Sequence, residues 1–253
     1  MIYDLQKANI WKRISAYLCD VILLGIVVVG MAFLLSTVLG YDTYTEQMDA
    51  SYAEYEARFG VSFDISAEDF EALSDAEKEN YNAAFAALSA DAEFSRSYTM
   101  AVNLTLIILT FAILFGYLLM EFFIPLLLKN GQTLGKKIFG IGVMRTDGVK
   151  LGAPFLFIRA ILGKYTVETM VPVMIILMIM LGALGVLGTV ILAALTVAQF
   201  MLLFSTKTRA QIHDKLAGTV VIDMSSQMIF DSPEALLAYK NRIHAEKAEK
   251  AEY

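Results

Sequence analysis

An acidic residue, Asp20, lies within a long run of apolar residues near the start of the chain. Arg13 precedes it by seven residues, nearly two helical turns, so both side chains should share one face, ~10 Å apart along the axis. If this run crosses a membrane, the arginine can extend to the membrane surface, but the aspartate is too short. A carboxylate at that depth costs at least ~2.5–3.5 kcal/mol unless it is paired, hydrated or protonated. We therefore expect Asp20 either to bind a cation or proton, or to fix helix packing through a hydrogen bond or an ion pair with Arg13 or another base.

Glu121 is a second carboxylate in an apolar segment, which ends near Lys129. In a helix it would lie ~12 Å inside that end, a depth similar to that of Asp20. Two neighbouring carboxylates at low dielectric require a proton, a cation or an arginine between them. The alternative is that Glu121 only reaches the headgroup region beside Lys129.

Asp214 follows His213, without a second histidine or a zinc-protease motif nearby, so no metal site is expected. Asp214 could cap a helix or pair with a cytoplasmic arginine such as Arg13 or Arg159. The segment from Gly131 to Lys137 resembles a phosphate loop, but it is one residue short and lacks the final Ser or Thr, so we expect a tight turn instead. No nucleophile stands beside a base in the sequence pattern. We expect neither enzymatic activity nor a cofactor, with a membrane enzyme only as a third alternative.

The elements that would position these residues are membrane helices, because the chain is 57% hydrophobic and only 18% charged. Residues 14–39 and 100–128 each suffice for one span. The stretch 169–204 is long for one helix and short for two, and its central glycines favour two short helices over a single long one. We predict an all-α polytopic membrane protein with about four transmembrane helices, in six segments: 1–39, 40–98, 99–128, 129–168, 169–205 and 206–253.

The segment 40–98 has a different character, with 14 acidic and 3 basic residues. Ser66 and Ser74 are each followed three residues later by an acid, as in helix capping boxes. Aromatic and apolar residues recur there at helical spacing, which predicts a small helical insert. The alternative is a disordered acidic loop.

The segment 129–168 is basic instead. Residues 137–145 alternate loosely and end in a Thr-Asp-Gly turn, which predicts a short β-hairpin or paired extended strands at the cytoplasmic surface. Residues 219–222 also have strand character and could pair with residues 137–145. Residues 151–165 resemble an amphipathic helix lying at the membrane surface. The tail 232–253 should be a polar helix.

The positive charges predict the orientation, because cytoplasmic loops carry an excess of Lys and Arg. Lys7, Lys12 and Arg13 precede the first span, and Lys207 and Arg209 follow the last. Both termini are therefore expected in the cytoplasm and the acidic insert outside, in the inner (plasma) membrane of a bacterium.

Three ordered motifs resemble the RDD family of bacterial membrane proteins, named for one arginine and two aspartates. They are residues 13–20 (RISAYLCD), 131–143 (GQTLGKKIFGIGV) and 213–221 (HDKLAGTVV). The resemblance makes Asp214 the second aspartate, and Arg159 is similar to a further arginine common in the family. It covers about 7–40 and 100–223, leaving out the insert and the tail.

Transport is often suggested for this family. The first hypothesis is therefore transport or exchange of small ions through a charged site of Arg13, Asp20, Glu121, Arg159 and Asp214, in a homo-oligomer. The second is a non-enzymatic scaffold or accessory subunit in which these residues form a structural lock and the acidic insert binds a partner. The lipid bilayer is an expected partner and nucleic acid is not, since the basic loop lacks interleaved aromatic residues and faces anionic lipid.

Overall fold

Four helices of the computed structural model, which describes residues 5–205 and 210–251, are long and apolar enough to cross a membrane. They are Ile10–Leu39, Ala92–Leu128, Ala153–Met180 and Gly185–Leu202. The predicted all-α polytopic membrane fold is thereby confirmed. Lys207 and Arg209, on which part of the predicted orientation rests, lie outside the described residues.

The first span is a single helix, α1 (Ile10–Leu39), whereas the second contains a wider turn. It comprises α5 (Ala92–Tyr117), a π-helical turn η1 (Leu118–Phe123) and α6 (Ile124–Leu128). Such π-helical turns change the direction of the side chains that follow and are frequent at functional sites.

The third span differs from the prediction, because it begins at Ala153. It comprises α8 (Ala153–Phe157), the π-helical η2 (Ile158–Met170) and α9 (Val171–Met180). Residues 151–165, predicted as a separate helix on the membrane surface, largely form its first half. The physical reason is that Arg159 and Lys164 find acidic partners inside the protein and do not need the headgroup region.

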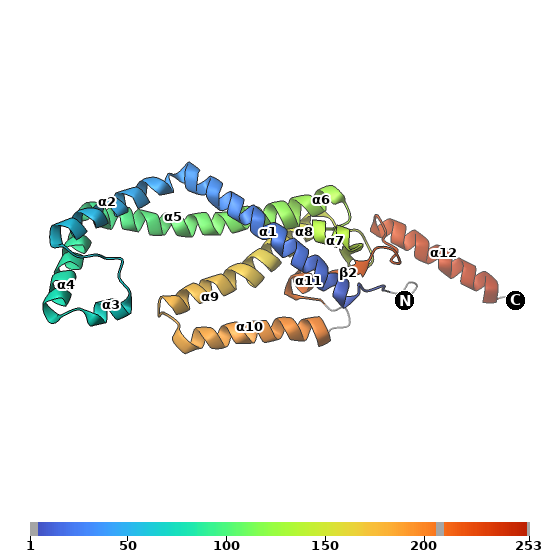
Figure 1. The fold of residues 1–253 in the computed structure, drawn as a ribbon. Helices are drawn as coiled ribbons and strands as arrows, with labels where there is room; N and C mark the ends of the chain where they lie inside the picture. The colour runs from blue at the N-terminus through green and yellow to red at the C-terminus, as the bar shows by residue number, and fades with distance from the viewer. Residues whose placement is uncertain (1–4, 206–209, 252–253) are drawn as a thin grey trace. The chain divides into compact units, whose positions relative to one another are not determined.

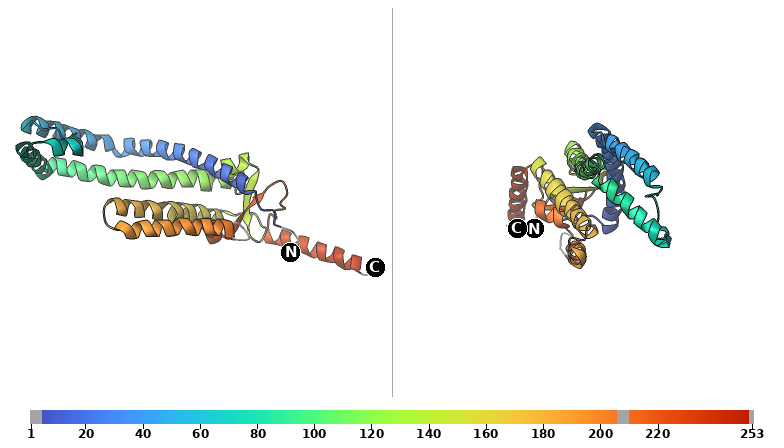
Figure 2. Two further views of the ribbon diagram at one scale, coloured as in Figure 1. Left: turned by 60° about the horizontal axis from the view of Figure 1, so that its bottom comes forward. Right: turned by 90° about the vertical axis from the view of Figure 1, so that its left-hand side faces the viewer.

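The fourth span, α10 (Gly185–Ser205), lies antiparallel beside α9 (Figures 1 and 2). The turn between them contains Gly182 with φ 72° and ends at Gly185 with φ 47°. These positive angles suit glycine, and the predicted division of residues 169–204 into two helices agrees with the structure.

A two-stranded antiparallel sheet joins segments that are far apart in the sequence. Strand β1 (Ile141–Arg145) pairs with β2 (Thr219–Asp223), with Val143 opposite Val221. The Thr-Asp-Gly turn forms as predicted, but the expected hairpin is reduced to one bridge between Met144 and Lys150. The short helices α7 (Leu134–Ile138) and α11 (Ile212–Ala217) precede the two strands.

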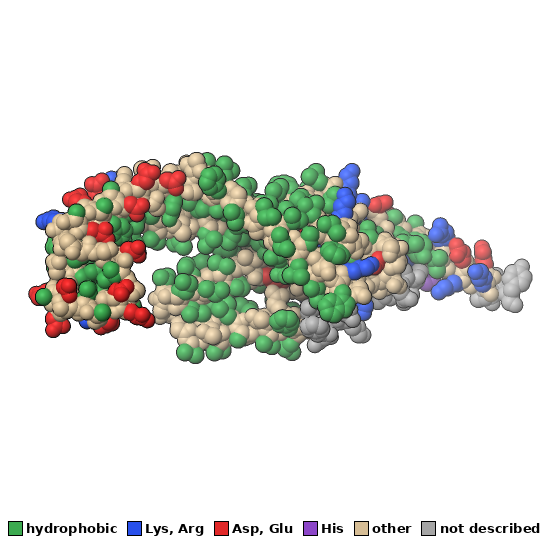
Figure 3. Space-filling model, viewed as in Figure 1, with side chains coloured by type: hydrophobic (Ala, Val, Ile, Leu, Met, Phe, Trp, Pro, Cys, Tyr) green, Lys and Arg blue, Asp and Glu red, His purple; other side chains and the backbone are tan. Residues whose placement is uncertain are grey.

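The chain divides into two compact units, one of residues 1–28 and 113–253 and the other of residues 29–112. The second unit contains the acidic insert, which forms α2 (Tyr41–Phe59), α3 (Ala67–Ala72) and α4 (Asp75–Ala90). Ser66 and Ser74 cap α3 and α4 as predicted, and aromatic side chains around Tyr55 and Phe94 form the core. Acidic side chains gather over these helices in Figure 3.

The tail forms the predicted helix, α12 (Pro233–Ala251). Its Leu236 packs with Phe230 and Val149, which attaches the start of the helix to the segment after β1.

Candidate functional site

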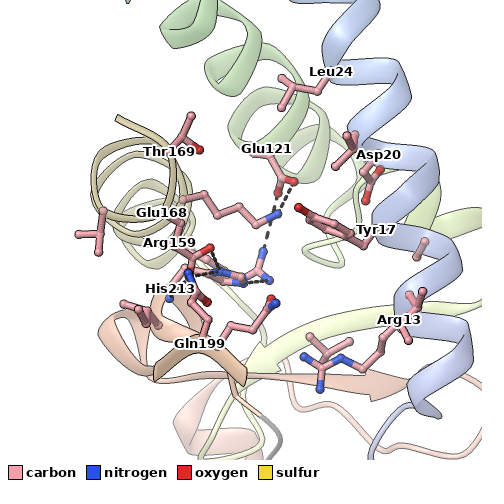
Figure 4. A pocket seen from close by; sticks show the side chains of 18 of the residues that line it. Arg13, Tyr17, Asp20, Leu24, Glu121, Arg159, Glu168, Thr169, Gln199 and His213 are labelled. Atoms are coloured by element: carbon pink, nitrogen blue, oxygen red, sulfur yellow. Dashed lines mark hydrogen bonds and ion pairs between the residues drawn. The ribbon is translucent and has the colours of Figure 1, made fainter. Parts of the chain in front are cut away.

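A cavity of about 560 Å³ lies among the membrane helices of the first unit. Helices α1 and α10 contribute mainly apolar side chains to its wall, including Leu24 and Leu195. Other lining residues are polar or charged, and Figure 4 shows several of their side chains directed toward one another. The charged and histidine side chains of the lining are Arg13, Asp20, Glu121, Lys136, Arg159, Lys164, Glu168 and His213.

Asp214 lies beside this cavity and is only 1% exposed. Its Oδ1 atom accepts hydrogen bonds from Arg159 Nε and Thr219 Oγ1, both at 3.0 Å, and Arg13 Nη2 lies 3.8 Å from Oδ2. Burial would raise the pKa of Asp214, but His213, Arg159 and Arg13 together hold it below the ordinary value. Asp214 is therefore an ionised carboxylate shared by two arginines, which ties α11 to both α1 and η2.

His213 is buried between an acid and an arginine. Its Nε2 atom lies 3.0 Å from Arg159 Nη2, and its Nδ1 atom lies 2.8 Å from Glu168 Oε2. Because arginine can only donate, Nε2 must accept and Nδ1 must carry the proton that it donates to Glu168. Burial lowers the pKa of His213, so the ring stays neutral. Gly163 allows this close approach, since a Cβ there would meet His213.

Asp20 is also buried, at 7% exposure, but its partners come from the segment after the second span. Its Oδ2 atom accepts a short hydrogen bond from the Thr133 hydroxyl, and its Oδ1 atom accepts one of 2.8 Å from the Gly135 backbone N–H. Lys136 Nζ lies 3.8 Å from Oδ2. A Cβ at Gly135 would overlap the Asp20 carboxyl group. Asp20 thus fastens α7 to α1.

Glu121, in the π-helical η1, is 6% exposed and faces three bases. Its Oε1 atom forms a short ion pair with Lys164 of η2, while Arg159 Nη1 lies 3.9 Å from Oε2, beyond hydrogen-bonding distance. Among the described residues, this Oε2 atom is buried without a hydrogen-bond partner. A buried carboxylate oxygen without a donor is costly, and it can be satisfied by a proton or a bound cation.

Comparison with protein families gives one decisive result: the model of the RDD family matches residues 7–218. The chain belongs to the RDD family. The match covers most of the chain and confirms the family that the three motifs indicate. No curated protein and no solved structure matches this RDD-family protein significantly.

The matched range contains every site residue predicted from the sequence of this RDD-family protein: Arg13, Asp20, Glu121, Arg159 and Asp214. The structure connects four of them in one chain of contacts, Arg13 to Asp214 to Arg159 to Glu121. Asp20 pairs with Lys136, and Arg13 pairs with Asp214, so the ion pair considered between Arg13 and Asp20 is replaced by two others.

Sequence reasoning did not single out Thr133, Lys136, Lys164, Glu168 or His213 as site residues of the RDD-family protein. The sequence could have indicated Lys164 and Glu168, because both are charged residues at the start of a strongly apolar stretch. Asp20 was singled out for a similar reason. Thr133 and Lys136 gave no such signal, because a polar turn after a membrane helix is normally in contact with water.

Proposed function

We propose that this RDD-family protein exchanges small cations for protons across a membrane through the charged cavity. The observation that supports this function is Glu121: its side chain lines the cavity, and its buried Oε2 atom lacks a hydrogen-bond donor. A small cation or a proton at that oxygen would supply the missing partner. The remaining ionic contacts would hold the carboxylate in place.

The orientation belongs to the same proposal. With both termini in the cytoplasm of a bacterium, the short sheet and its basic neighbours lie on the cytoplasmic side of the inner membrane, and the cavity opens toward that side. Four spans are few for a transporter, so we propose that the working form is a homo-oligomer.

Cation flux into proteoliposomes containing a pH-sensitive dye tests the function. The wild-type protein should change the internal pH when sodium or potassium is added outside. Glu121→Gln, which keeps the shape but removes the charge, should lower the rate at least about tenfold, because a loss of ~1.4 kcal/mol of cation binding has that effect. Equal rates for Glu121→Gln and the wild type would reject the proposal.

A matched control is Glu54→Gln, which removes an exposed carboxylate from α2. It should leave the rate unchanged. Size-exclusion chromatography of both variants shows whether each retains its fold, so that a lost flux is assigned to the site and not to unfolding.

A second, also non-enzymatic function is a membrane scaffold or accessory subunit. The contacts of Asp20 and of Asp214 favour it, since each carboxylate oxygen has a hydrogen-bond or ion-pair partner from another segment, as in a structural lock. The acidic insert would then bind a partner outside the membrane. This function predicts no cation-dependent pH change in wild-type proteoliposomes and recovery of a stable partner by crosslinking in cells.

A further inference from the structure

The cavity is larger and more apolar than a bare metal cation requires. Its volume of about 560 Å³ lies within the range of roughly 300–1,000 Å³ that is typical of sites for small organic molecules. Such sites are mostly apolar, with a few polar groups that orient the ligand. Apolar side chains line this cavity from three helices: Val21 and Leu24 of α1, Pro172 of α9, and Leu192 and Leu195 of α10. The lining therefore suits a ligand with an apolar part.

Glu121 is the polar group that can orient such a ligand. It is 6% exposed, and in the described part of the chain its Oε2 atom is buried without a hydrogen-bond donor. Lys164 holds the other oxygen, Oε1, and Arg159 Nη1 lies 3.9 Å from Oε2. These contacts fix the carboxylate and leave Oε2 able to accept a hydrogen bond. One N–H donor of a ligand satisfies this oxygen, whereas a metal ion needs several oxygen ligands at once.

Tyr17 of α1 places a second polar group near Glu121. Figure 4 shows the Tyr17 and Glu121 side chains directed toward the same space. Tyr17, Val21 and Leu24 follow one another at spacings of four and three residues, so they share one face of α1. The tyrosine hydroxyl and the apolar wall are thus neighbours along the cavity.

The proposed exchange sets the charge of the ligand. A ligand with one positive charge replaces the single charge of the proton for which it is exchanged, so the site has the same net charge before and after. A positive charge also suits the ionised carboxylate of Glu121, because hydrogen bonds between charged groups are the strongest in proteins. An ammonium group meets both requirements, since it has one charge and several N–H donors.

We infer that the cation of the proposed exchange is a primary ammonium ion with a short apolar chain. Its N–H groups donate to Glu121 Oε2 and to the Tyr17 hydroxyl, and its chain lies against Leu24 and Leu195. The inference rests on the proposed function and adds the substrate class. A sodium or potassium ion can reach the same oxygen, but it gains nothing from the apolar wall and should bind less tightly.

Calorimetric titration of the purified protein in detergent at pH 7 tests the inference with three chloride salts. Alkylamines are protonated at this pH, as lysine is. Hexylammonium has both N–H donors and an apolar chain, ammonium lacks the chain, and hexyltrimethylammonium keeps the chain and the charge but has no N–H donor. Titration into detergent alone is the blank for uptake by micelles.

The wild type should bind hexylammonium at least about tenfold more tightly than either of the other two ions. One charged hydrogen bond, or a few buried CH₂ groups, has an effect of this size. Equal affinities for hexylammonium and either of the other ions overturn the inference, as does the absence of saturable hexylammonium binding. This comparison needs only the wild-type protein, so it holds even where a variant does not fold.

Two pairs of variants assign the binding to the residues named. Glu121→Gln should weaken hexylammonium binding at least about tenfold, whereas Glu54→Gln, on the exposed surface of α2, should not change it. Leu195→Ala should weaken the binding of hexylammonium but not that of ammonium. Leu187→Ala is its control, because Leu187 is on the same helix and is 61% exposed. Wild-type affinity for hexylammonium in both Glu121→Gln and Leu195→Ala contradicts the inference.

The proteoliposome experiment separates failure of the substrate class from failure of exchange. Saturable hexylammonium binding in detergent, without a cation-dependent pH change in liposomes, supports the ammonium site but rejects exchange as the function. A pH change driven by sodium or potassium, without hexylammonium binding, leaves the exchange in place and rejects the ammonium ion as its substrate.

Discussion

The two units of this protein treat electrical charge in opposite ways. The insert between residues 40 and 98 has 14 acids and 3 bases, and its ion pair between Lys78 and Glu71 is largely exposed on the acidic side. In the first unit, the carboxylates of Asp20, Glu121 and Asp214 are almost completely buried and each has a basic neighbour. Water solvates the acidic side chains of the insert, whereas protein groups must stabilise the three buried carboxylates of the first unit. Stability in the insert therefore depends on aromatic packing and helix caps, and in the first unit on ionic contacts.

The largest effect is expected from Asp214→Ala, which leaves Arg13 and Arg159 without their shared carboxylate. Removing one partner of a buried ion pair costs about 3–5 kcal/mol of unfolding free energy. Thermal unfolding in detergent should show a large loss of stability. Asp231→Ala serves as the control, since the Asp231 side chain is 90% exposed and its ion pair with Lys150 is long, at 3.6 Å. A small and equal effect of both substitutions would contradict the dependence of the first unit on its buried ionic contacts.

An intermediate effect is expected from Thr133→Val, which keeps the side-chain shape but removes the hydroxyl group. Asp20 Oδ2 would lose its hydrogen-bond donor, at a cost of about 1–3 kcal/mol. Thr99→Val in α5 is the comparison, because the exposed Thr99 hydroxyl donates its hydrogen bond to the Ser95 carbonyl oxygen of the same helix. Equal melting temperatures of the two variants would contradict a fastening role for Asp20.

The smallest of these effects is expected in the insert. Ser74→Ala removes the capping box of α4, in which Glu77 N–H donates to Ser74 Oγ and Ser74 N–H donates to Glu77. The loss should be about 1 kcal/mol, seen as faster hydrogen exchange in the first turn of α4. Ser51→Ala, within α2, should cause no comparable change. An effect of Ser74→Ala as large as that of Asp214→Ala would mean that both units depend on polar contacts equally.

The fold class, the four spans and the family could be predicted because they depend on local properties of the chain. Apolar run length, glycine clusters and caps such as Ser74 are visible in a short window of sequence. The start of the third span could not be predicted from such a short window. Arg159 and Lys164 reduce the apolar character of residues 153–165. Their acidic partners, Asp214 and Glu121, explain why this part of the helix can belong to a membrane span.

The residues of the site could be predicted better than their pairing. An acid in an apolar segment, as at Asp20 or Glu121, needs a partner, but the sequence does not state which base lies opposite. The choice depends on the register between helices and on the π-helical turns η1 and η2, which hydrophobic periodicity does not reveal. For this reason Arg13 reaches Asp214, and Asp20 reaches the turn that holds Lys136.

The pairing of β1 with β2 has a consequence for biosynthesis. Strand β1 ends at Arg145 and its partner begins at Thr219, so the ribosome must deliver the third and fourth spans before the two strands can meet. Closing so long a loop is slow compared with forming a local hairpin. Strand β1 of the nascent chain therefore stays unpaired until β2 has been synthesised. The two-stranded sheet forms only after the helices of the third and fourth spans have been made.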